Sequence, residues 1–216
     1  MSLPILYSLR QCPYAMRARL GLLLAQQPVM LRDIIMTNIP EEMFEASPKG
    51  EVPVLVLDDG TVIDESIDIM RWALQINDPQ DLLYKNYPSL IEETKIFINF
   101  NDNEFVDALK KYKAASRYHD VAEVERRKEC EVFIKDIEIR LSQHEYIFGD
   151  VPSLADYAIL PFIRQFSRVD RKWYLQSPYP KLRKWLERHY KNPLFSKAMK
   201  KYPQWLDEKE NVLFGL

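Results

Sequence analysis

The feature that most constrains this fold is a change in the spacing of apolar residues near residue 77. Before that point, short apolar runs of strand length alternate with segments whose apolar residues recur every three or four positions. Beyond residue 88, the apolar stripes have the helical spacing throughout. Spacing of this kind is the main sequence signal for secondary structure. The sequence therefore predicts an α/β domain followed by an all-α domain.

The first 76 residues are predicted to follow the order strand, helix, strand, helix, hairpin, helix. The expected strands span 4–8, 29–35, 52–57 and 61–63, and the expected helices span 13–26, 40–46 and 66–76. Asp58-Asp59-Gly60 stands between two apolar runs and is typical of a hairpin turn. This order is typical of one compact α/β unit.

Residues 77–88 contain two prolines and several polar side chains, so they are predicted to link the two domains. The second domain is expected to cover residues 89–216. Its expected helices include 91–112, 120–143, 179–190 and 193–201. Another, nearly all apolar, follows the capping-box pattern Ser153-Leu154-Ala155-Asp156. The tail after Tyr202 carries large apolar residues, so we expect it to pack against the protein.

Composition narrows the possible functions. The 216 residues carry 30 Lys and Arg against 32 Asp and Glu, and a net charge of -2 disfavours a nucleic-acid partner. No apolar run approaches the ~20 residues that span a bilayer, and the N-terminus lacks a secretion signal. Two distant cysteines suit a reducing cytoplasm, which is the expected location. The three histidines show no ligand spacing, so we expect no metal site.

Cys12 is the strongest candidate for chemistry. It follows a predicted strand and directly precedes Pro13, which suits the first turn of a helix. Unpaired N–H groups and the dipole at a helix start favour a thiolate. A fall in thiol pKa from ~8.5 to ~6 would raise the thiolate fraction at pH 7 from roughly 3% to about 90%. The alternative is that Cys12 is a small apolar residue beneath a helix start.

Ala15 occupies the position at which a Cys-x-x-Cys motif carries its second thiol. A mixed disulfide at Cys12 would therefore need an outside thiol to resolve it, and a small cytosolic thiol is the natural candidate. Arg10, Arg17 and Arg19 would add positive potential near the sulfur, or serve surface solubility instead. Cys130 is expected to pack as a small apolar residue within a helix.

Two further motifs could recognise a peptide-like ligand. If the Val52-Pro53 bond were cis, the Val52 backbone could pair with such a ligand as an added strand does. Glu65 and Ser66 stand at a predicted helix start, where an acid and a helix-terminal donor suit the amine and carboxylate of an amino acid. Simple helix capping is the alternative for this second motif.

Taken together, these motifs resemble the cytosolic glutathione S-transferases over essentially the whole chain. Cys12-Pro13-Tyr14-Ala15 is similar to the motif of the cysteine-type omega class and its bacterial relatives. Val52-Pro53, Glu65-Ser66 and the capping box after Gly149 match three other family motifs. The chain is also similar to two-domain glutaredoxins over 52–69, although those carry a second cysteine where Ala15 stands.

The resemblance implies a thioredoxin-like glutathione-binding domain at 1–76, a linker at 77–88 and a helical bundle at 89–216. It implies that Cys12 forms a mixed disulfide with glutathione, a co-substrate, in thiol transfer, deglutathionylation, or disulfide or dehydroascorbate reduction. A homodimer without metal, nucleic acid or membrane is expected. The implied glutathione-binding residues are Pro13, Tyr14, Lys49, Val52, Pro53, Glu65 and Ser66. In the omega class a lysine stands at Ile39, and Lys49 is a candidate to replace it.

The second substrate, which is a small electrophilic, disulfide or glutathionylated molecule, is expected between the domains. The residues expected to form its wall are Asn101, Tyr112, Phe166 and Trp173. Asn101 has an equal alternative as a satisfied core amide or a kink in its helix. Two rival functions stay open. One is a non-catalytic interaction protein of the stringent-starvation type, and the other is a conjugating transferase that uses Tyr7 or Ser8.

Overall fold

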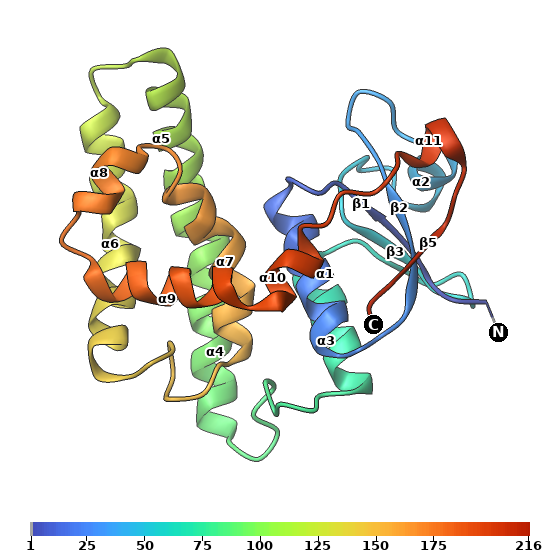
Figure 1. The fold of residues 1–216 in the computed structure, drawn as a ribbon, viewed down its shortest axis with the longest axis horizontal. Coiled ribbons are helices and arrows are strands. Elements are labelled where there is room, and N and C mark those ends of the chain that lie inside the picture. The colour runs from blue at the N-terminus through green and yellow to red at the C-terminus, as the bar shows by residue number, and fades with distance from the viewer. Residues whose placement is uncertain (1) are drawn as a thin grey trace. The chain divides into compact units, whose positions relative to one another are not determined.

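The computed structural model describes residues 2–216, which form two compact units (Figure 1). Unit 1 extends to Gln80 and also includes Asn192–Leu216, and unit 2 is Asp81–Lys191. This division differs from the expected linker at 77–88 and the expected second domain at 89–216. The last part of the chain belongs with the N-terminal unit, because it supplies that unit with an additional strand. No described helix is long and apolar enough to cross a membrane.

Unit 1 is built on a five-stranded mixed sheet with the order β4-β3-β1-β2-β5. The strands are β1 (Ile5–Ser8), β2 (Val29–Asp33), β3 (Val54–Val56), β4 (Val62–Ile63) and β5 (Val212–Phe214). Strand β1 is parallel to β2 and antiparallel to β3. Because β1 and β2 are parallel, the carboxyl end of β1 and the turn that follows it lie at the same edge of the sheet as the end of β2.

Helices cover both faces of this sheet (Figure 1). Helices α1 (Pro13–Leu24) and α3 (Ser66–Ile76) pack together on one face, and α2 (Glu41–Ala46) lies on the other. A Cβ atom at Gly21 would lie 2.6 Å from the Cα of Met70, so this α1–α3 contact requires glycine. The predicted α/β order of the first 76 residues is confirmed.

The C-terminal segment completes unit 1. It contains α10 (Pro193–Ala198), α11 (Trp205–Glu208) and β5, which pairs antiparallel with β2. Trp205 and Phe214 are buried, as expected for a tail that packs against the protein. The region 89–216, expected to be all-α, is therefore helical only up to this segment, which adds a strand to the sheet. This strand, β5, covers the edge of the sheet at β2, which would otherwise be open.

Unit 2 is helical throughout its regular structure. Its elements are α4 (Pro88–Phe100), the π-helical turn η1 (Asn101–Phe105), α5 (Val106–Tyr118), α6 (Glu123–Gln143), α7 (Leu154–Phe166), α8 (Arg171–Gln176) and α9 (Pro180–Lys191). Phe97, Phe105, Phe133 and Phe166 form a continuous set of ring contacts in its core. Helix α7 is almost entirely buried, as its apolar sequence predicts.

The capping box before α7 is present as predicted. Asp156 is fully buried and accepts hydrogen bonds from the Ser153 N–H at 2.9 Å and the Ser153 hydroxyl at 2.7 Å. It also accepts from the Ile147 N–H at 3.1 Å and the Trp185 indole at 2.8 Å. One carboxylate therefore joins the start of α7 to the preceding loop and to α9.

Candidate active site

Cys12 occupies the N-cap position of α1, directly before Pro13, as the sequence predicts. Its backbone is extended, and its N–H donates to the Leu9 carbonyl at 3.0 Å, which closes a tight turn after β1. The side chain is partly exposed. The first turn of α1 contains no acidic residue. The Cys12 side chain makes no capping hydrogen bond to this helix start, and no carboxylate from the same turn opposes the positive end of the helix dipole beside it.

Val52 lies directly against Cys12. The Cys12 thiol donates to the Val52 carbonyl with Sγ and O 3.8 Å apart, although 40 residues separate them in sequence. The Val52-Pro53 peptide bond is cis, which the sequence could not establish. Cys12 and Val52 also share one apolar cluster of unit 1 with Tyr7 and Ile34. The structure thus brings the first two predicted motifs into contact.

Lys49, Glu65 and Ser66 gather at the start of α3. The Lys49 ammonium lies 3.0 Å from the Glu65 carboxylate and 3.3 Å from that of Asp64. Although burial alone would raise the pKa of Asp64, hydrogen bonds from Ser47 and Lys49 lower it overall. Ser66 is the first residue of α3 and is buried, whereas Glu65 is exposed. Lys49 is therefore engaged by acids of this motif in the structure.

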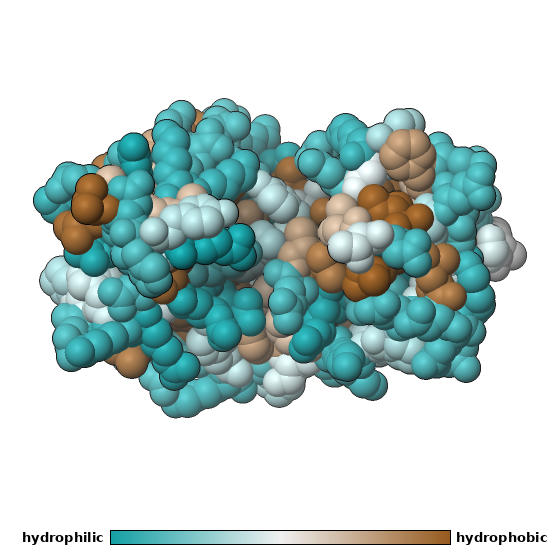
Figure 2. Space-filling view, turned by 90° about the horizontal axis from the view of Figure 1, so that it is seen from above, coloured by the Kyte–Doolittle hydropathy of each residue, from teal (hydrophilic) through white to brown (hydrophobic). Residues whose placement is uncertain are grey.

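Ile39, at the position where the omega class has lysine, packs against the same apolar cluster as Cys12. It belongs to the loop between β2 and α2, which also exposes Met36, and the exposed Phe44 follows in α2. Figure 2 shows apolar surface gathered at the end of unit 1 that carries this loop. An apolar rim thus replaces a cation here.

Two hydroxyl groups near Cys12 are already committed to arginines. The Tyr7 hydroxyl accepts from Arg32 at 2.7 Å, and burial raises the pKa of Tyr7 although Arg32 opposes the shift. The Ser8 hydroxyl is fully buried and accepts from Arg19 Nε at 2.8 Å. Neither hydroxyl is placed as a solvent-facing nucleophile or as an activated donor to a thiol.

Sequence reasoning missed the role of Arg19. We expected positive potential or surface solubility from the arginines of this helix, but Arg17 and Arg19 are buried, at 1% and 0% exposure. Arg19 forms an ion pair with Asp33 at 2.6 Å. The signal that could have found it is position, because Arg19 lies between Ala18 and Leu20 on a helix that is buried on most sides.

The four residues expected to line a second-substrate site all belong to unit 2. Asn101 is buried in η1, where its amide donates to Asp102 at 2.8 Å. Tyr112 and Phe166 are enclosed in the aromatic core and contact each other, and burial raises the pKa of Tyr112 to about 12. Enclosed side chains offer a ligand no surface. Trp173 is half-buried, with the Arg127 guanidinium 4.1 Å from its ring centre.

Cys130 packs as the sequence predicts. Its side chain is fully buried in α6, and burial raises the pKa of its thiol to about 12. A thiol in this state is a poor nucleophile and metal ligand. Within residues 2–216, no group of three metal-ligating side chains could hold an ion.

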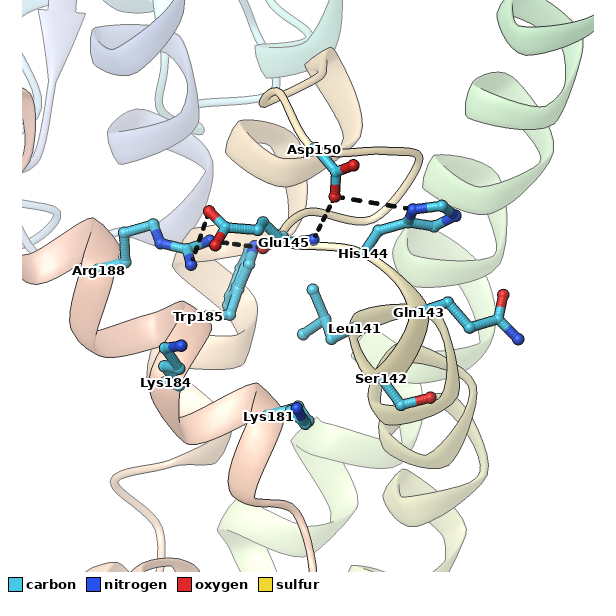
Figure 3. Close-up of a pocket in the computed structure, with 10 residues that line it drawn as sticks. All are labelled: Leu141, Ser142, Gln143, His144, Glu145, Asp150, Lys181, Lys184, Trp185 and Arg188. Carbon is cyan, nitrogen blue, oxygen red and sulfur yellow. Dashed lines mark hydrogen bonds and ion pairs between the residues drawn. The ribbon is translucent and has the colours of Figure 1, made fainter.

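Unit 2 contains a cavity of about 220 Å³ that none of the predicted site residues lines (Figure 3). Charged side chains of α9 and of the loop after α6 surround it, and several of these pair with one another. Arg188 contacts the Glu145 carboxylate at 3.1 Å, and His144 lies 3.8 Å from Asp150 (Figure 3). All the residues that line this polar depression belong to unit 2.

Comparison with known proteins identifies the class that this fold and these motifs define. The glutathione S-transferase N-terminal domain model matches residues 6–80, and the C-terminal domain model matches residues 125–188. The chain therefore belongs to the glutathione S-transferase family, and it is a glutathione transferase-like enzyme. The predicted architecture, an α/β thioredoxin-like domain with a helical C-terminal region, is confirmed.

Individual relatives are members or neighbours in sequence and structure to which the chain is similar. It is 25% identical over 191 residues to glutathione S-transferase omega-1 of Mus musculus, covering 88% of this chain and 78% of that protein. It is 30% identical over 196 residues to pyrimidodiazepine synthase of Drosophila melanogaster, covering 87% and 77%. A glutathione transferase family member from Pseudomonas fluorescens, solved with two glutathione bound, superposes with a TM-score of 0.79 at 16% identity over 92% of each chain.

Proposed function

We propose that this enzyme is a glutathione-dependent thiol transferase or reductase in which Cys12 is the nucleophile. The observation that carries the proposal is the position of Cys12, at the N-cap of α1 and beside the cis Val52-Pro53 bond, whose carbonyl oxygen lies 3.8 Å from its sulfur. A cysteine placed at a helix start is activated toward the thiolate. The similarity to the omega-1 transferase supports the same assignment.

Glutathione is the proposed co-substrate, bound along unit 1. The Val52 backbone would pair with its cysteinyl part, and Pro13 and Tyr14, which directly follow Cys12 in the first turn of α1, would line the site beside it. Glu65 and Ser66 would hold its γ-glutamyl end, since an exposed acid and a helix start complement an amine and a carboxylate. Lys49, which is paired with Glu65 in the structure, is the candidate cation for the glycyl carboxylate, in place of the lysine that the omega class has at the position of Ile39.

The proposed reaction has two thiol–disulfide exchanges. The Cys12 thiolate attacks the glutathione sulfur of a mixed disulfide, forming a Cys12–glutathione disulfide and releasing the substrate thiol, which takes up a proton. A second glutathione thiolate then attacks that bond, releasing oxidised glutathione and restoring the Cys12 thiolate. Glutathione supplies both electrons. Ala15 makes the outside thiol necessary, because no second cysteine lies in this helix turn.

The rival functions make different use of the same residues. A conjugating transferase that relied on Tyr7 or Ser8 would need a hydroxyl that glutathione can reach, but both side chains are buried and accept hydrogen bonds from arginines. A non-catalytic interaction protein would need no thiol at the start of α1. The commitment of both hydroxyls favours the cysteine chemistry.

Mass spectrometry of the intact protein tests the proposal. After incubation with oxidised glutathione, we expect one glutathione adduct on the wild type and on Cys130→Ala, and none on Cys12→Ala. Disulfide reduction with glutathione should fall at least about a hundredfold in Cys12→Ala, because the covalent step is lost. Absence of an adduct on the wild type would overturn the proposal.

We also propose that two copies associate through the groove between α4 and α6. Ile96, Phe100 and Val132 are 63%, 38% and 63% exposed there, and Glu93 and Arg140 flank them with opposite charges. Such a surface is complementary to a second copy of itself. In light scattering, Val132→Glu should yield monomers, whereas Val151→Glu, at an equally exposed position, should not. A monomeric wild type would contradict this assembly.

A further inference from the structure

A buried ion pair lies next to the turn between β1 and Cys12. Arg19 Nη2 and Asp33 Oδ1 are 2.6 Å apart, and the two side chains are 0% and 10% exposed. Burying such a pair is costly, and well-packed apolar residues often stabilise a protein as well or better. What an ion pair provides that apolar residues cannot is a set of directional contacts.

Those contacts reach the turn at two points. Arg19 Nε donates to the Ser8 hydroxyl at 2.8 Å, where β1 ends and the turn begins. The Asp33 carboxylate accepts the backbone N–H of Arg10, in the middle of the turn. The Ile34 N–H, next to Asp33, donates to the Ser8 carbonyl at 2.9 Å. One member of the pair therefore holds the Ser8 side chain at the end of β1, and the other holds the backbone of the turn at Arg10.

The same pair also fixes the turn relative to α1. Arg19 lies seven residues after Cys12 on this helix, which is about two helical turns. Asp33 is the last residue of β2, beside the end of β1. The helix that follows Cys12, the strand that precedes it and the neighbouring strand thus meet at one guanidinium group.

The C-terminal segment of unit 1 covers the pair. Arg19 Nη1 donates to the Ala198 carbonyl at the end of α10, at 3.4 Å, and Asp33 forms a β-bridge with Gln204. This cover removes the pair from water, where its contacts would be weaker and more mobile. The order of the turn thereby depends on residues far from Cys12 in sequence.

We propose that Arg19 and Asp33 are positioning residues that hold the Cys12 turn in its reactive geometry, an inference that rests on Cys12 being the nucleophile. The contacts of the pair described above go to Ser8, Arg10, Ala198 and Gln204, which are outside the residues proposed to bind glutathione. Loss of the pair should therefore lower the rate of the exchange step and leave glutathione binding nearly unchanged. A residue that serves stability alone would not produce this separation.

The experiment compares Asp33→Asn, Arg19→Lys and Ser8→Ala with the wild type. We expect kcat for disulfide reduction to fall about tenfold in Asp33→Asn, with KM for glutathione within about twofold, because a misplaced nucleophile loses rate before binding. Arg19→Lys keeps the positive charge but loses the planar guanidinium with its several N–H donors, so its kcat should fall nearly as far. Glu131→Gln, which breaks the partly buried Arg127–Glu131 pair of unit 2, is the matched control and should leave both constants unchanged.

The pH dependence of Cys12 alkylation separates geometry from charge. Removing the Asp33 carboxylate leaves a cation behind the turn, which by charge alone would shift the profile to lower pH. Lost alignment of the helix start predicts a shift to higher pH instead. A shift to higher pH together with the kcat loss supports the proposal, whereas a shift to lower pH overturns it.

Ser8→Ala decides the matter if Asp33→Asn does not fold, because it leaves the ion pair intact and removes one of its contacts to the turn. A fall in kcat of about threefold without a change in KM supports the proposal. Unchanged kcat in a folded Ser8→Ala protein overturns it. A wild type that forms no glutathione adduct would instead refute the proposed function, so the two failures are distinguishable.

Discussion

The two units each bury one aspartate, and the two carboxylates are satisfied in different ways. In unit 2, Asp156 accepts four hydrogen bonds from neutral donors, contributed by Ile147, Ser153 and Trp185. In unit 1, Asp33 lies against the guanidinium of Arg19 and accepts one backbone N–H of the Cys12 turn. An aspartate side chain is thus buried without a counter-ion in unit 2 and within an ion pair in unit 1.

The two sets of contacts join different parts of the molecule. The donors to Asp156 come from the loop before α7, from the α7 start and from α9, so the carboxylate joins elements that distinguish the helical unit. The contacts of Asp33 converge instead on the few residues before Cys12. Replacing each aspartate should therefore damage a different property, and three predictions test this, from the largest expected effect to the smallest.

The largest effect is expected from Asp156→Ala. The substitution would leave four buried donors without an acceptor, and each such donor costs about 1–3 kcal/mol, not fully additively. We expect the free energy of unfolding to fall by about 5 kcal/mol, measured by urea denaturation. Asp150→Ala, in the same loop but exposed, is the control and should change it by less than about 0.5 kcal/mol. A loss below about 2 kcal/mol would mean that water replaces the lost acceptor.

A smaller loss of stability, which a second substitution should reverse, is expected at the Arg19–Asp33 ion pair. Asp33→Leu alone leaves the Arg19 guanidinium buried without its counter-ion, which should cost about 3 kcal/mol in urea denaturation. Adding Arg19→Met should restore most of that loss, because an apolar pair of similar volume needs no compensation. Asp156 has no single partner whose removal would bring such relief. If the double variant were no more stable than Asp33→Leu, the contrast between the two aspartates would disappear.

Much of the fold followed from local patterns in the sequence. The period change near residue 77, the prolines at helix starts and the capping box identified the elements and the family. What the sequence could not show was the place of residues 192–216. Their helices have ordinary amphipathic patterns, and the pairing of β5 with β2 joins positions nearly the whole chain apart. No pattern among neighbouring residues predicts such a contact.

The candidate site divides in the same way. Cys12, Val52 and the Glu65-Ser66 motif were identified because each sits at a helix start or a strand start with recognisable chemistry. Arg19 was missed because an arginine on a helix is usually solvated, and its partner Asp33 lies on another element. Tyr112 and Phe166 were proposed for a substrate wall, but an aromatic side chain in a helical stripe gives no sign of whether it faces a cleft or the core.

The smallest expected effect concerns pH and the Asp156 side of the comparison. The ring of His189 lies edge-to-face with Trp185, the indole donor to Asp156, with ring centres 4.5 Å apart, and it also contacts the rings of Tyr146 and Tyr157. Burial, and to a lesser extent the charge of Arg188, lower the pKa of His189 from 6.5 to about 3. The folded protein therefore keeps this histidine neutral at pH values where the unfolded chain protonates it. Stability should then be lost progressively as the pH falls below about 6.5.

At pH 5 the loss should be about 2 kcal/mol relative to pH 7.5, since each pH interval of one below 6.5 contributes about 1.4 kcal/mol. His189→Phe should remove that part of the pH dependence, whereas the exposed His119→Gln should not. Burial raises the pKa of Asp156, which acts in the opposite direction, but that contribution is common to wild type and variant and cancels in their difference. Equal slopes of unfolding free energy against pH for wild type and His189→Phe would show that the folded state also protonates His189. A protonated His189 would then lie beside the donors to Asp156. Asp156 would have a cation nearby, as Asp33 has in Arg19, and the contrast between the two aspartates would be weaker.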